Sequence, residues 1–384
     1  MRILYVAMKY DYGKPEQGYS FEHYNFFDSL LHMGHDITYF DFMSLMQRDG
    51  RRQMNERLLE TVKTEKPDVM FTVLFSYELD KKVISRISEK TDTKTVNWFC
   101  DDHWRFDNYS RHWTPCFDWV VTTAASALPK YARMGYKNVI KSQWGCNHTI
   151  YRKLNLPLEY DATFIGLPHG DRRETVRTIH EAGINVQCWG KGWESGRLTQ
   201  DEMIRVFNQS RINLNLSNAS VYTEPKRWKN LARTAISDLL EIVPFGSHIK
   251  TVGKARLSGL SSSKSNTKVS AKDSTVYEKC PDQIKGRNFE VPGCGGFLLT
   301  SMVENLGDYY EIGKEVVCFE NVDDAIEKIR YYLEHEEERA SIAQAGYLRT
   351  LHEHTYAARF NAIFRKIGLP CEDSEIREGR VKEI

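Results

Sequence analysis

Residues 282–300 combine two cations, two carboxylates and a run of glycines, and have the clearest potential for chemistry in the sequence. Their spacing predicts a short helix, a glycine-rich turn and a strand. Lys285 and Arg287 would lie in the first helical turn, where free backbone N–H groups and the helix dipole favour an anion such as a pyrophosphate. Glu290 follows Arg287 by one turn, so the two share a helix face. The Glu290 carboxylate could accept hydrogen bonds from ribose hydroxyls, or the two residues could form an ordinary ion pair.

Two glycine turns in the second half of the chain could contact the same ligand. Gly166 follows a predicted strand, and a glycine there lets the backbone approach a phosphate that Arg172 could also contact. Trp189 and Gly190 follow another predicted strand and could frame the base of a nucleotide. A capped helix start and a core turn are the alternative interpretations of these residues.

Acidic residues and histidines in the first half could activate a hydroxyl group. Asp101, Asp102 and His103 directly follow an apolar run, and a general base needs only hydrogen-bond reach and a suitable pKa. An ion-paired loop is the alternative. Glu22 and His23 follow the loop after the first predicted strand and are weaker candidates on the same side.

The elements that position these residues alternate along the first half of the chain. Short apolar runs of strand type are separated by helical patterns, which is typical of a parallel sheet covered on both faces. We expect strands at 1–7, 36–42, 68–75, 95–100, 119–123 and 139–144, and helices at 21–33, 53–66, 79–90 and 126–134.

The same alternation restarts near residue 160, so we expect an α/β protein of two doubly wound domains, 1–150 and 151–352. Ligands in such sheets bind outside the carboxyl ends of the strands, which predicts a site in a cleft between the domains. The segment 353–384 could pack back on the first domain. The expected strands are 162–165, 185–189, 212–216, 297–300 and 315–319, and the expected helices are 172–182, 199–209, 322–335, 336–345 and 355–367.

An insertion at about 218–282 interrupts the second domain. Apolar residues have helical spacing in 226–240, with Lys and Arg between them, and 254–272 is basic and rich in serine. A solvated surface insertion, a surface for a partner or acceptor, and a contact of 226–272 with an anionic membrane surface all fit this pattern.

The composition is that of a globular protein. The 384 residues are 41% hydrophobic, and 53 Lys and Arg balance 52 Asp and Glu, so the net charge of +1 gives no support for a nucleic-acid partner. The eight cysteines are scattered without a Cys-x-x-Cys pair, which favours reduced thiols in the cytoplasm and argues against a structural metal site. No apolar stretch approaches the ~18 residues of a transmembrane helix.

The run Phe-Glu-Val-Pro-Gly-Cys-Gly-Gly-Phe-Leu-Leu-Thr at 289–300 resembles the nucleotide-sugar signature of GT-B glycosyltransferases of the group-1 type. The chain looks most like their CgeB, or spore-maturation, branch. Asp-Ala-Thr-Phe-Ile-Gly at 161–166, Trp-Gly-Lys-Gly-Trp at 189–193 and Ile-Asn-Leu-Asn-Leu-Ser at 212–217 agree with it. The resemblance covers roughly residues 125–368.

This resemblance implies two facing Rossmann-like domains and transfer of a sugar from a nucleotide-diphospho-sugar, with UDP or GDP as the nucleotide, to a hydroxyl of a glycan, polysaccharide, lipid or protein. Glu290 takes the place of the ribose-binding glutamate, Lys285 and Arg287 face the diphosphate, and Thr300 belongs to the donor site. Many relatives have a second glutamate where this chain has Asp282, and a Gly-Phe-Gly stretch that it lacks.

Absent motifs narrow the reaction class. The sequence has no Asp-x-Asp, which metal-dependent glycosyltransferases use, so we expect no metal and no cofactor besides the donor. Walker, Gly-x-Gly-x-x-Gly and Gly-x-Ser-x-Gly motifs are also absent, which counts against P-loop ATPases, NAD dehydrogenases and α/β-hydrolases. A non-catalytic nucleotide-sugar-binding or envelope-assembly protein and a sugar-nucleotide epimerase remain alternatives. The oligomeric state is left open.

Overall fold

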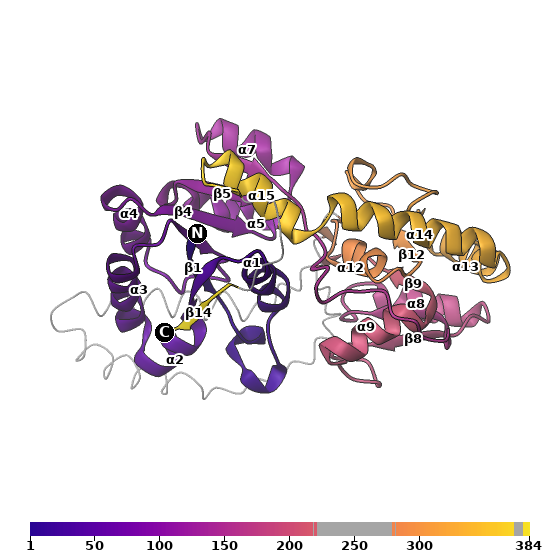
Figure 1. The fold of residues 1–384 in the computed structure, drawn as a ribbon. Helices are drawn as coiled ribbons and strands as arrows, with labels where there is room; N and C mark the ends of the chain where they lie inside the picture. Colours follow the sequence, from indigo (N-terminus) through magenta and orange to yellow (C-terminus); the bar gives the residue numbers. More distant parts are fainter. Residues whose placement is uncertain (218, 221–278, 281, 372–378) are drawn as a thin grey trace, which may run out of the picture. The chain divides into compact units, whose positions relative to one another are not determined.

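The computed structural model describes residues 1–217, 219–220, 279–280, 282–371 and 379–384 (Figure 1). Met1–Ala219 and Pro281–Ile384 form one compact unit. Most of the predicted insertion belongs to a second unit, Ser220–Cys280. The predicted partner or membrane contact of 226–272 therefore lies outside the described residues.

The first half of the chain builds a seven-stranded parallel sheet of order β14-β2-β1-β3-β4-β5-β6. Both faces of this sheet are covered, which is why strands such as β1 are almost continuously buried. The six predicted strands are present, and the edge strand β14 was not predicted because its sequence is polar and its residues are exposed. The strands are β1 (Arg2–Ala7), β2 (Asp36–Asp41), β3 (Val69–Thr72), β4 (Lys94–Phe99), β5 (Trp119–Thr122), β6 (Val139–Lys141) and β14 (Val381–Glu383).

Helices cover the two faces of this sheet through separate apolar clusters. Successive residues of β1 alternate between the clusters, with Leu4 in one and Tyr5 in the other. The Leu4 cluster includes residues of α2 (Phe42–Asp49), α3 (Arg51–Glu65), α4 (Lys81–Lys90) and α7 (Leu128–Arg133). The Tyr5 cluster includes residues of a π-helical turn (His23–Phe27), α1 (Asp28–His32) and α15 (Tyr356–Lys366).

Some helices differ from the sequence predictions for local reasons. Helix α2 was not predicted, and it begins where it does because the side chain of Asp41 accepts hydrogen bonds from the backbone N–H groups of Met43 and Ser44. Gly50 then separates α2 from α3. The stretch after β4 also forms short helices that were not predicted: α5 (Asp102–Arg105), a π-helical turn (Phe106–Ser110) and α6 (Arg111–Trp113).

The second half builds a five-stranded parallel sheet of order β13-β12-β9-β7-β8, and its five strands match those predicted. The strands are β7 (Tyr160–Ile165), β8 (Val186–Trp189), β9 (Ser210–Asn215), β12 (Leu298–Ser301) and β13 (Val317–Phe319). The helices are α8 (Arg172–Glu181), α9 (Gln200–Gln209), α12 (Arg287–Gly293), α13 (Val322–Glu334) and α14 (Glu336–Glu353). The short strands β10 (Ala219–Ser220) and β11 (Lys279–Cys280) pair beside the insertion.

Helix α14 is longer than the predicted helix at 336–345, and that predicted end is wrong. Gly346 lies inside the helix, and a glycine is needed there because the helix packs closely against the backbone of Glu315. A Cβ atom at Gly346 would lie 2.2 Å from the carbonyl oxygen of Glu315, so only glycine fits.

The chain passes between the two sheets twice, and the two passages are hydrogen-bonded to each other. Cys146, between β6 and β7, donates its backbone N–H to the carbonyl of His354 at 2.8 Å. Its own carbonyl accepts from the N–H of Tyr356 at 3.0 Å. Gly145 is required beside them because a Cβ atom would lie 2.9 Å from the His354 carbonyl oxygen. The domain boundaries at 150 and 352 remain predictions.

Candidate functional site

Glu290 lies in the interior of the second half, on helix α12. Its carboxylate is completely buried. One oxygen, Oε1, accepts a hydrogen bond of 2.9 Å from the hydroxyl of Tyr151, and the other, Oε2, pairs with the guanidinium of Arg287. The i,i+3 proximity of Arg287 and Glu290 is thus as the spacing predicts. Because the carboxylate is completely buried, a ribose could reach it only after the surrounding side chains move.

Burial and the charge of Glu290 together set the protonation states of Arg287 and Tyr151. Burial is the largest single effect on Arg287 and disfavours its charged form, but Glu290 together with Tyr151 and Cys294 outweighs burial and raises the pKa of the guanidinium. Burial raises the pKa of Tyr151 well above its ordinary value, so its hydroxyl stays protonated and donates to Glu290. Tyr151 was missed by the sequence analysis, because no local spacing connects positions 139 residues apart.

Lys285 lies before helix α12, which begins at Arg287, so the prediction that Lys285 is in the first helical turn is wrong. The reason is a side chain: Asn288 Oδ1 accepts the backbone N–H of Lys285 at 2.9 Å and fixes the preceding segment in a turn. Gln283 and Ile284, just before Lys285, are buried. The segment that leads into α12 is therefore fixed by buried residues before Lys285 and by the hydrogen bond to Asn288 after it.

Asn288 belongs to a buried polar network at the carboxyl ends of β9 and β12. Asn215 Nδ2 donates to Asn288 Oδ1 and to Thr300 Oγ1, both at 3.0 Å, and Asn288 Nδ2 donates to Thr300 Oγ1 at 3.2 Å. None of the three side chains is more than 4% exposed. Thr300, a predicted donor-site residue, is therefore enclosed in this network and could act on a ligand only through its neighbours.

Arg172 lies at the start of α8, after the turn that follows β7. Its Nη1 and Nη2 groups donate to the carbonyls of Leu167 and Leu216 at 2.8 and 2.6 Å. Burial, with a smaller contribution from the nearby charge of Arg287, lowers the pKa of Arg172 to about 10. Within the described residues, the buried Nε groups of both arginines have no hydrogen-bond partner. Two guanidinium donors from different elements are thus left unsatisfied in one region, which favours an anion there.

The two glycine turns contact each other. Gly190 has a φ of 139°, and a Cβ atom on it would lie 2.3 Å from the carbonyl oxygen of Gly166. That same carbonyl accepts the indole N–H of Trp193 at 2.8 Å, and the N–H of Gly166 donates to the carbonyl of Trp189 at 2.9 Å. The Trp189 ring meets that of Tyr160 edge-on at 5.4 Å. The turn after β7 and the turn after β8 are thus held against each other by backbone contacts.

The first-half candidates after β4 differ in their surroundings. Asp102 is buried, its Oδ2 accepts the hydroxyl of Tyr131 at 2.7 Å, and burial raises its pKa. His103 is half-buried; burial lowers its pKa to about 4, with a further contribution from the charge of Lys285. His103 is therefore neutral near pH 7, and its low pKa makes it a weak base in this structure. Asp101 is also half-buried, and its carbonyl accepts the N–H of Arg105 at 2.8 Å.

Glu22 and His23 lie where the π-helical turn begins. Burial raises the pKa of Glu22 to about 6 and lowers that of His23 to about 4. The His23 ring is stacked between the rings of Tyr19 and Phe27, at centroid distances of 4.1 and 4.9 Å. His23 is therefore packed among aromatic rings, whereas Glu22 is half-buried.

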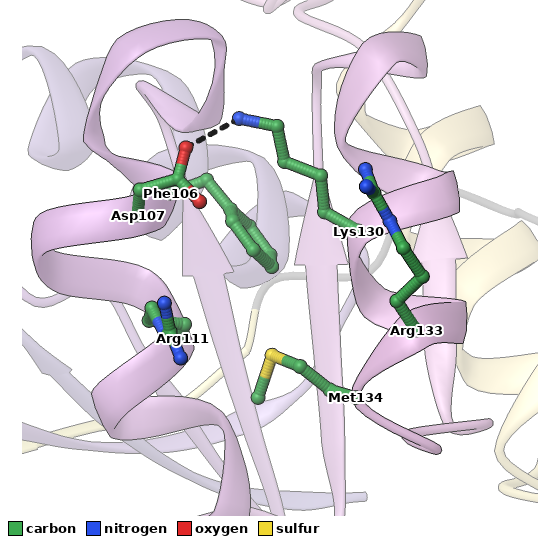
Figure 2. Close-up of a pocket in the computed structure, with 6 residues that line it drawn as sticks. All are labelled: Phe106, Asp107, Arg111, Lys130, Arg133 and Met134. Atoms are coloured by element: carbon green, nitrogen blue, oxygen red, sulfur yellow. Dashed lines mark hydrogen bonds and ion pairs between the residues drawn. The ribbon is translucent and has the colours of Figure 1, made fainter.

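A pocket of about 410 Å³ lies on the helices that follow β4 and β5, and no predicted site residue lines it (Figure 2). Its lining comes from two helical stretches, one from Phe106 to Arg111 and one from Lys130 to Met134. Sequence analysis missed it because the first stretch was not predicted to be helical. The lining residues are Phe106, Asp107, Arg111, Lys130, Arg133 and Met134.

No group of three or more His, Cys, Asp or Glu side chains in the described part could hold a metal ion. None of the described helices combines the length and apolar character that a membrane crossing requires.

Comparison with known proteins gives a family match and structural likenesses. A family model described as "Glycosyl transferase-like" matches residues 172–235 and 224–365, which together make up half of the chain. No curated protein matches the chain by sequence.

The structure resembles solved structures over almost the whole chain. HepE of Anabaena in complex with UDP-glucose has a TM-score of 0.58 at 9% identity, covering 96% of this chain and 99% of HepE. Sucrose-phosphate synthase of Thermosynechococcus elongatus has a TM-score of 0.55 at 8% identity, covering 96% and 97%. A glycosyltransferase of Rickettsia africae has a TM-score of 0.54 at 8% identity, covering 97% and 99%.

Proposed function

The chain belongs to the glycosyl transferase-like family and has the GT-B fold, and on this premise we propose that it transfers a sugar from a nucleotide-diphospho-sugar to an acceptor hydroxyl. The donor is a UDP- or GDP-sugar. HepE, which has a similar fold, was crystallised with UDP and with UDP-glucose. The run at 289–300 supports a place in the CgeB branch of the family.

The observation that carries this proposal is the pair of unsatisfied guanidinium donors. The Nε groups of Arg172 and Arg287 are buried without a hydrogen-bond partner among the described residues. A diphosphate has oxygens enough to satisfy both, and a buried unsatisfied donor costs about 1–3 kcal/mol. As the glycosidic bond breaks, negative charge gathers on the leaving diphosphate. Arg172, Arg287 and Lys285 stabilise that charge without a metal ion.

Glu290 binds the ribose in this proposal. The hydroxyl of Tyr151 holds Oε1, and Oε2 is bound to Arg287 when no ligand is present. Ribose hydroxyls replace Arg287 on Oε2 while the guanidinium moves onto the diphosphate. After this exchange the guanidinium is paired with the diphosphate and the carboxylate accepts hydrogen bonds from neutral hydroxyls, so neither group is left without a polar partner.

The acceptor hydroxyl is deprotonated on the first-half side. His103 is the candidate base, because its imidazole is half-buried and unprotonated near pH 7; its pKa of about 4 makes it a weak base when no ligand is bound. Asp102 holds the backbone beside His103 in place, because its enclosed carboxylate accepts a hydrogen bond from Tyr131. Asp101 and Glu22, both half-buried, orient the acceptor.

Release of nucleoside diphosphate tests the proposal. The full chain is incubated with a panel of UDP- and GDP-sugars, with and without simple sugars and polyols, and the parent is compared with Arg287→Ala and with the exposed control Arg86→Ala. Acceptor-dependent release by the parent and the control, lost in Arg287→Ala, supports transfer. Nucleotide binding without release by any donor identifies a non-catalytic protein instead. Isomerised donor without any acceptor identifies an epimerase.

A further inference from the structure

The pocket of about 410 Å³ on the first half carries more positive charge than its own acidic residue neutralises (Figure 2). Three cations and one carboxylate line it. Lys130 and Asp107 pair across it at 2.6 Å. Arg111 and Arg133 are exposed, and neither forms an ion pair with a described residue. Two guanidinium groups therefore face the pocket with their charge uncompensated.

The walls of the pocket are fixed to each other. Tyr131, in the same helix as Lys130, donates its hydroxyl to the buried Asp102 at 2.7 Å. Its ring meets that of Phe106 edge-on at 4.8 Å. These contacts join α7 to the helical stretch that begins at Asp102, so the cations are presented by a rigid frame. Phe106 is buried, and with Met134 it forms an apolar part of the lining between the charged groups (Figure 2).

The three cations and one carboxylate of the pocket favour a phosphate over a carboxylate ligand. Arginine binds oxyanions through two parallel N–H groups, and phosphate suits this geometry well. A ligand must also compete with Asp107 for Lys130. A carboxylate carries the same charge as Asp107 and gains little, whereas a phosphate monoester carries about −1.5 to −2 charges near pH 7. The volume is in the range of about 300–1,000 Å³ that small-molecule sites have.

We propose that this pocket binds a phosphate monoester, and that the phosphate is part of the acceptor. The second part rests on the proposed transferase function. Arg111 follows His103 by eight residues, roughly 12 Å along a helix axis. A phosphorylated acceptor held by Arg111 and Arg133 must therefore be long enough to span about this distance to extend a hydroxyl towards Asp101 and His103. The phosphate orients the acceptor, and the carbon part of the ester packs against Phe106.

Calorimetric titration of the full chain with glycerol 1-phosphate, without nucleotide, tests the binding. We expect the parent to bind, the double variant Arg111→Ala/Arg133→Ala to bind at least tenfold more weakly, and the control Arg86→Ala to bind like the parent. UDP affinity and the thermal midpoint should be the same in all three, which shows that the variants are folded. Glucuronate should bind more weakly than glycerol 1-phosphate.

The outcomes separate this inference from the proposed function. No binding by the parent, equal binding by the double variant, or equal affinity for glucuronate overturns the phosphate pocket. Arginine-dependent sedimentation with phosphatidylglycerol vesicles, without binding of glycerol 1-phosphate, also overturns it and identifies a membrane surface. If glycerol 1-phosphate binds through both arginines but no donor releases its nucleotide, the pocket stands and the transferase proposal falls.

Discussion

The hydroxyl of Tyr151 donates a hydrogen bond of 2.9 Å to Glu290 Oε1, although 139 residues separate the two in the chain. Tyr151 lies just after the first passage between the sheets, and Glu290 lies on α12 of the second sheet. The passage thus orients the carboxylate to which we assign the ribose. Donor binding is thereby connected to the segment that joins the two halves of the chain.

Tyr151→Phe removes this donor and leaves the ring in place. We expect weaker nucleotide binding, with a several-fold rise in the KM for the donor and little change in kcat, because the carboxylate loses its orientation but not its charge. The unfolding free energy should fall by about 1–3 kcal/mol, since the buried oxygen loses a partner. Steady-state kinetics and urea unfolding measure the two effects, with the exposed Tyr77→Phe as control. A change in kcat alone contradicts the role of Tyr151.

Glu290→Gln keeps the shape of the side chain and removes its charge. The half-buried guanidinium of Arg287 then loses its ion-pair partner, and this costs less than the roughly 3–5 kcal/mol of a fully buried pair because solvent reaches the cation. We expect a lower thermal midpoint and a loss of UDP affinity of at least tenfold. Saturating UDP should restore part of the midpoint if the diphosphate takes over the pairing of Arg287. If UDP binds with parental affinity, the ribose assignment is wrong.

Arg172→Ala removes one of the two unsatisfied guanidinium groups. We expect UDP to bind about 10- to 100-fold more weakly and uridine to bind as in the parent, because only the diphosphate contact is lost. Arg172→Lys should recover part of the UDP affinity, since it keeps the charge but not the planar fork. Titration calorimetry with UDP and uridine decides this. Equal loss for uridine and UDP would indicate a general distortion instead.

Thr300→Val and Thr300→Ser together test the polar network. Valine removes the oxygen to which Asn215 and Asn288 donate, whereas serine retains it. We expect Thr300→Val to lower the unfolding free energy by about 1–3 kcal/mol and to raise the donor KM, because the turn before α12 is no longer fixed. Thr300→Ser should behave nearly like the parent. Similar donor KM values in both variants would show that the network does not position the donor site.

His354 makes the stability of the fold depend on pH. Burial, with a smaller contribution from the charge of Arg359, lowers its pKa from 6.5 to about 4. The unfolded chain binds this proton at a higher pH than the folded chain does. The contribution of His354 is therefore complete above about pH 6.5 and is lost as the pH falls towards 4.

Urea unfolding at pH 7.5 and pH 5 of the parent, His354→Gln and the exposed control His112→Gln measures this loss. We expect the parent and the control to lose more unfolding free energy between the two pH values than His354→Gln. Asp28 and Glu22 have raised pKa values and act in the opposite direction, but they are common to all three proteins. Equal pH dependence of the three proteins would show that His354 is not the group responsible.

The sequence predicts the two sheets well, because alternation of apolar strands and amphipathic helices is a local property. The contact between Arg287 and Glu290 is likewise local, since it follows from helical spacing. Tyr151 could not be predicted, because a single tyrosine in a linker carries no periodic signal. The complete burial of Thr300 and the hydrogen-bond partners of Arg172 also depend on segments far away in the chain, so they could not be predicted from local sequence.

The position of α15 affects the order in which the chain can fold during synthesis. Phe360 and Ile363 of α15 belong to the same apolar cluster as Tyr5 of β1. The ribosome therefore completes six of the seven strands, β1 to β6, before it makes α15, which covers part of one face. That part of the face stays exposed, and able to bind chaperones, while more than 200 further residues emerge. Helix α15 and then the edge strand β14 complete the half of the protein that was made first.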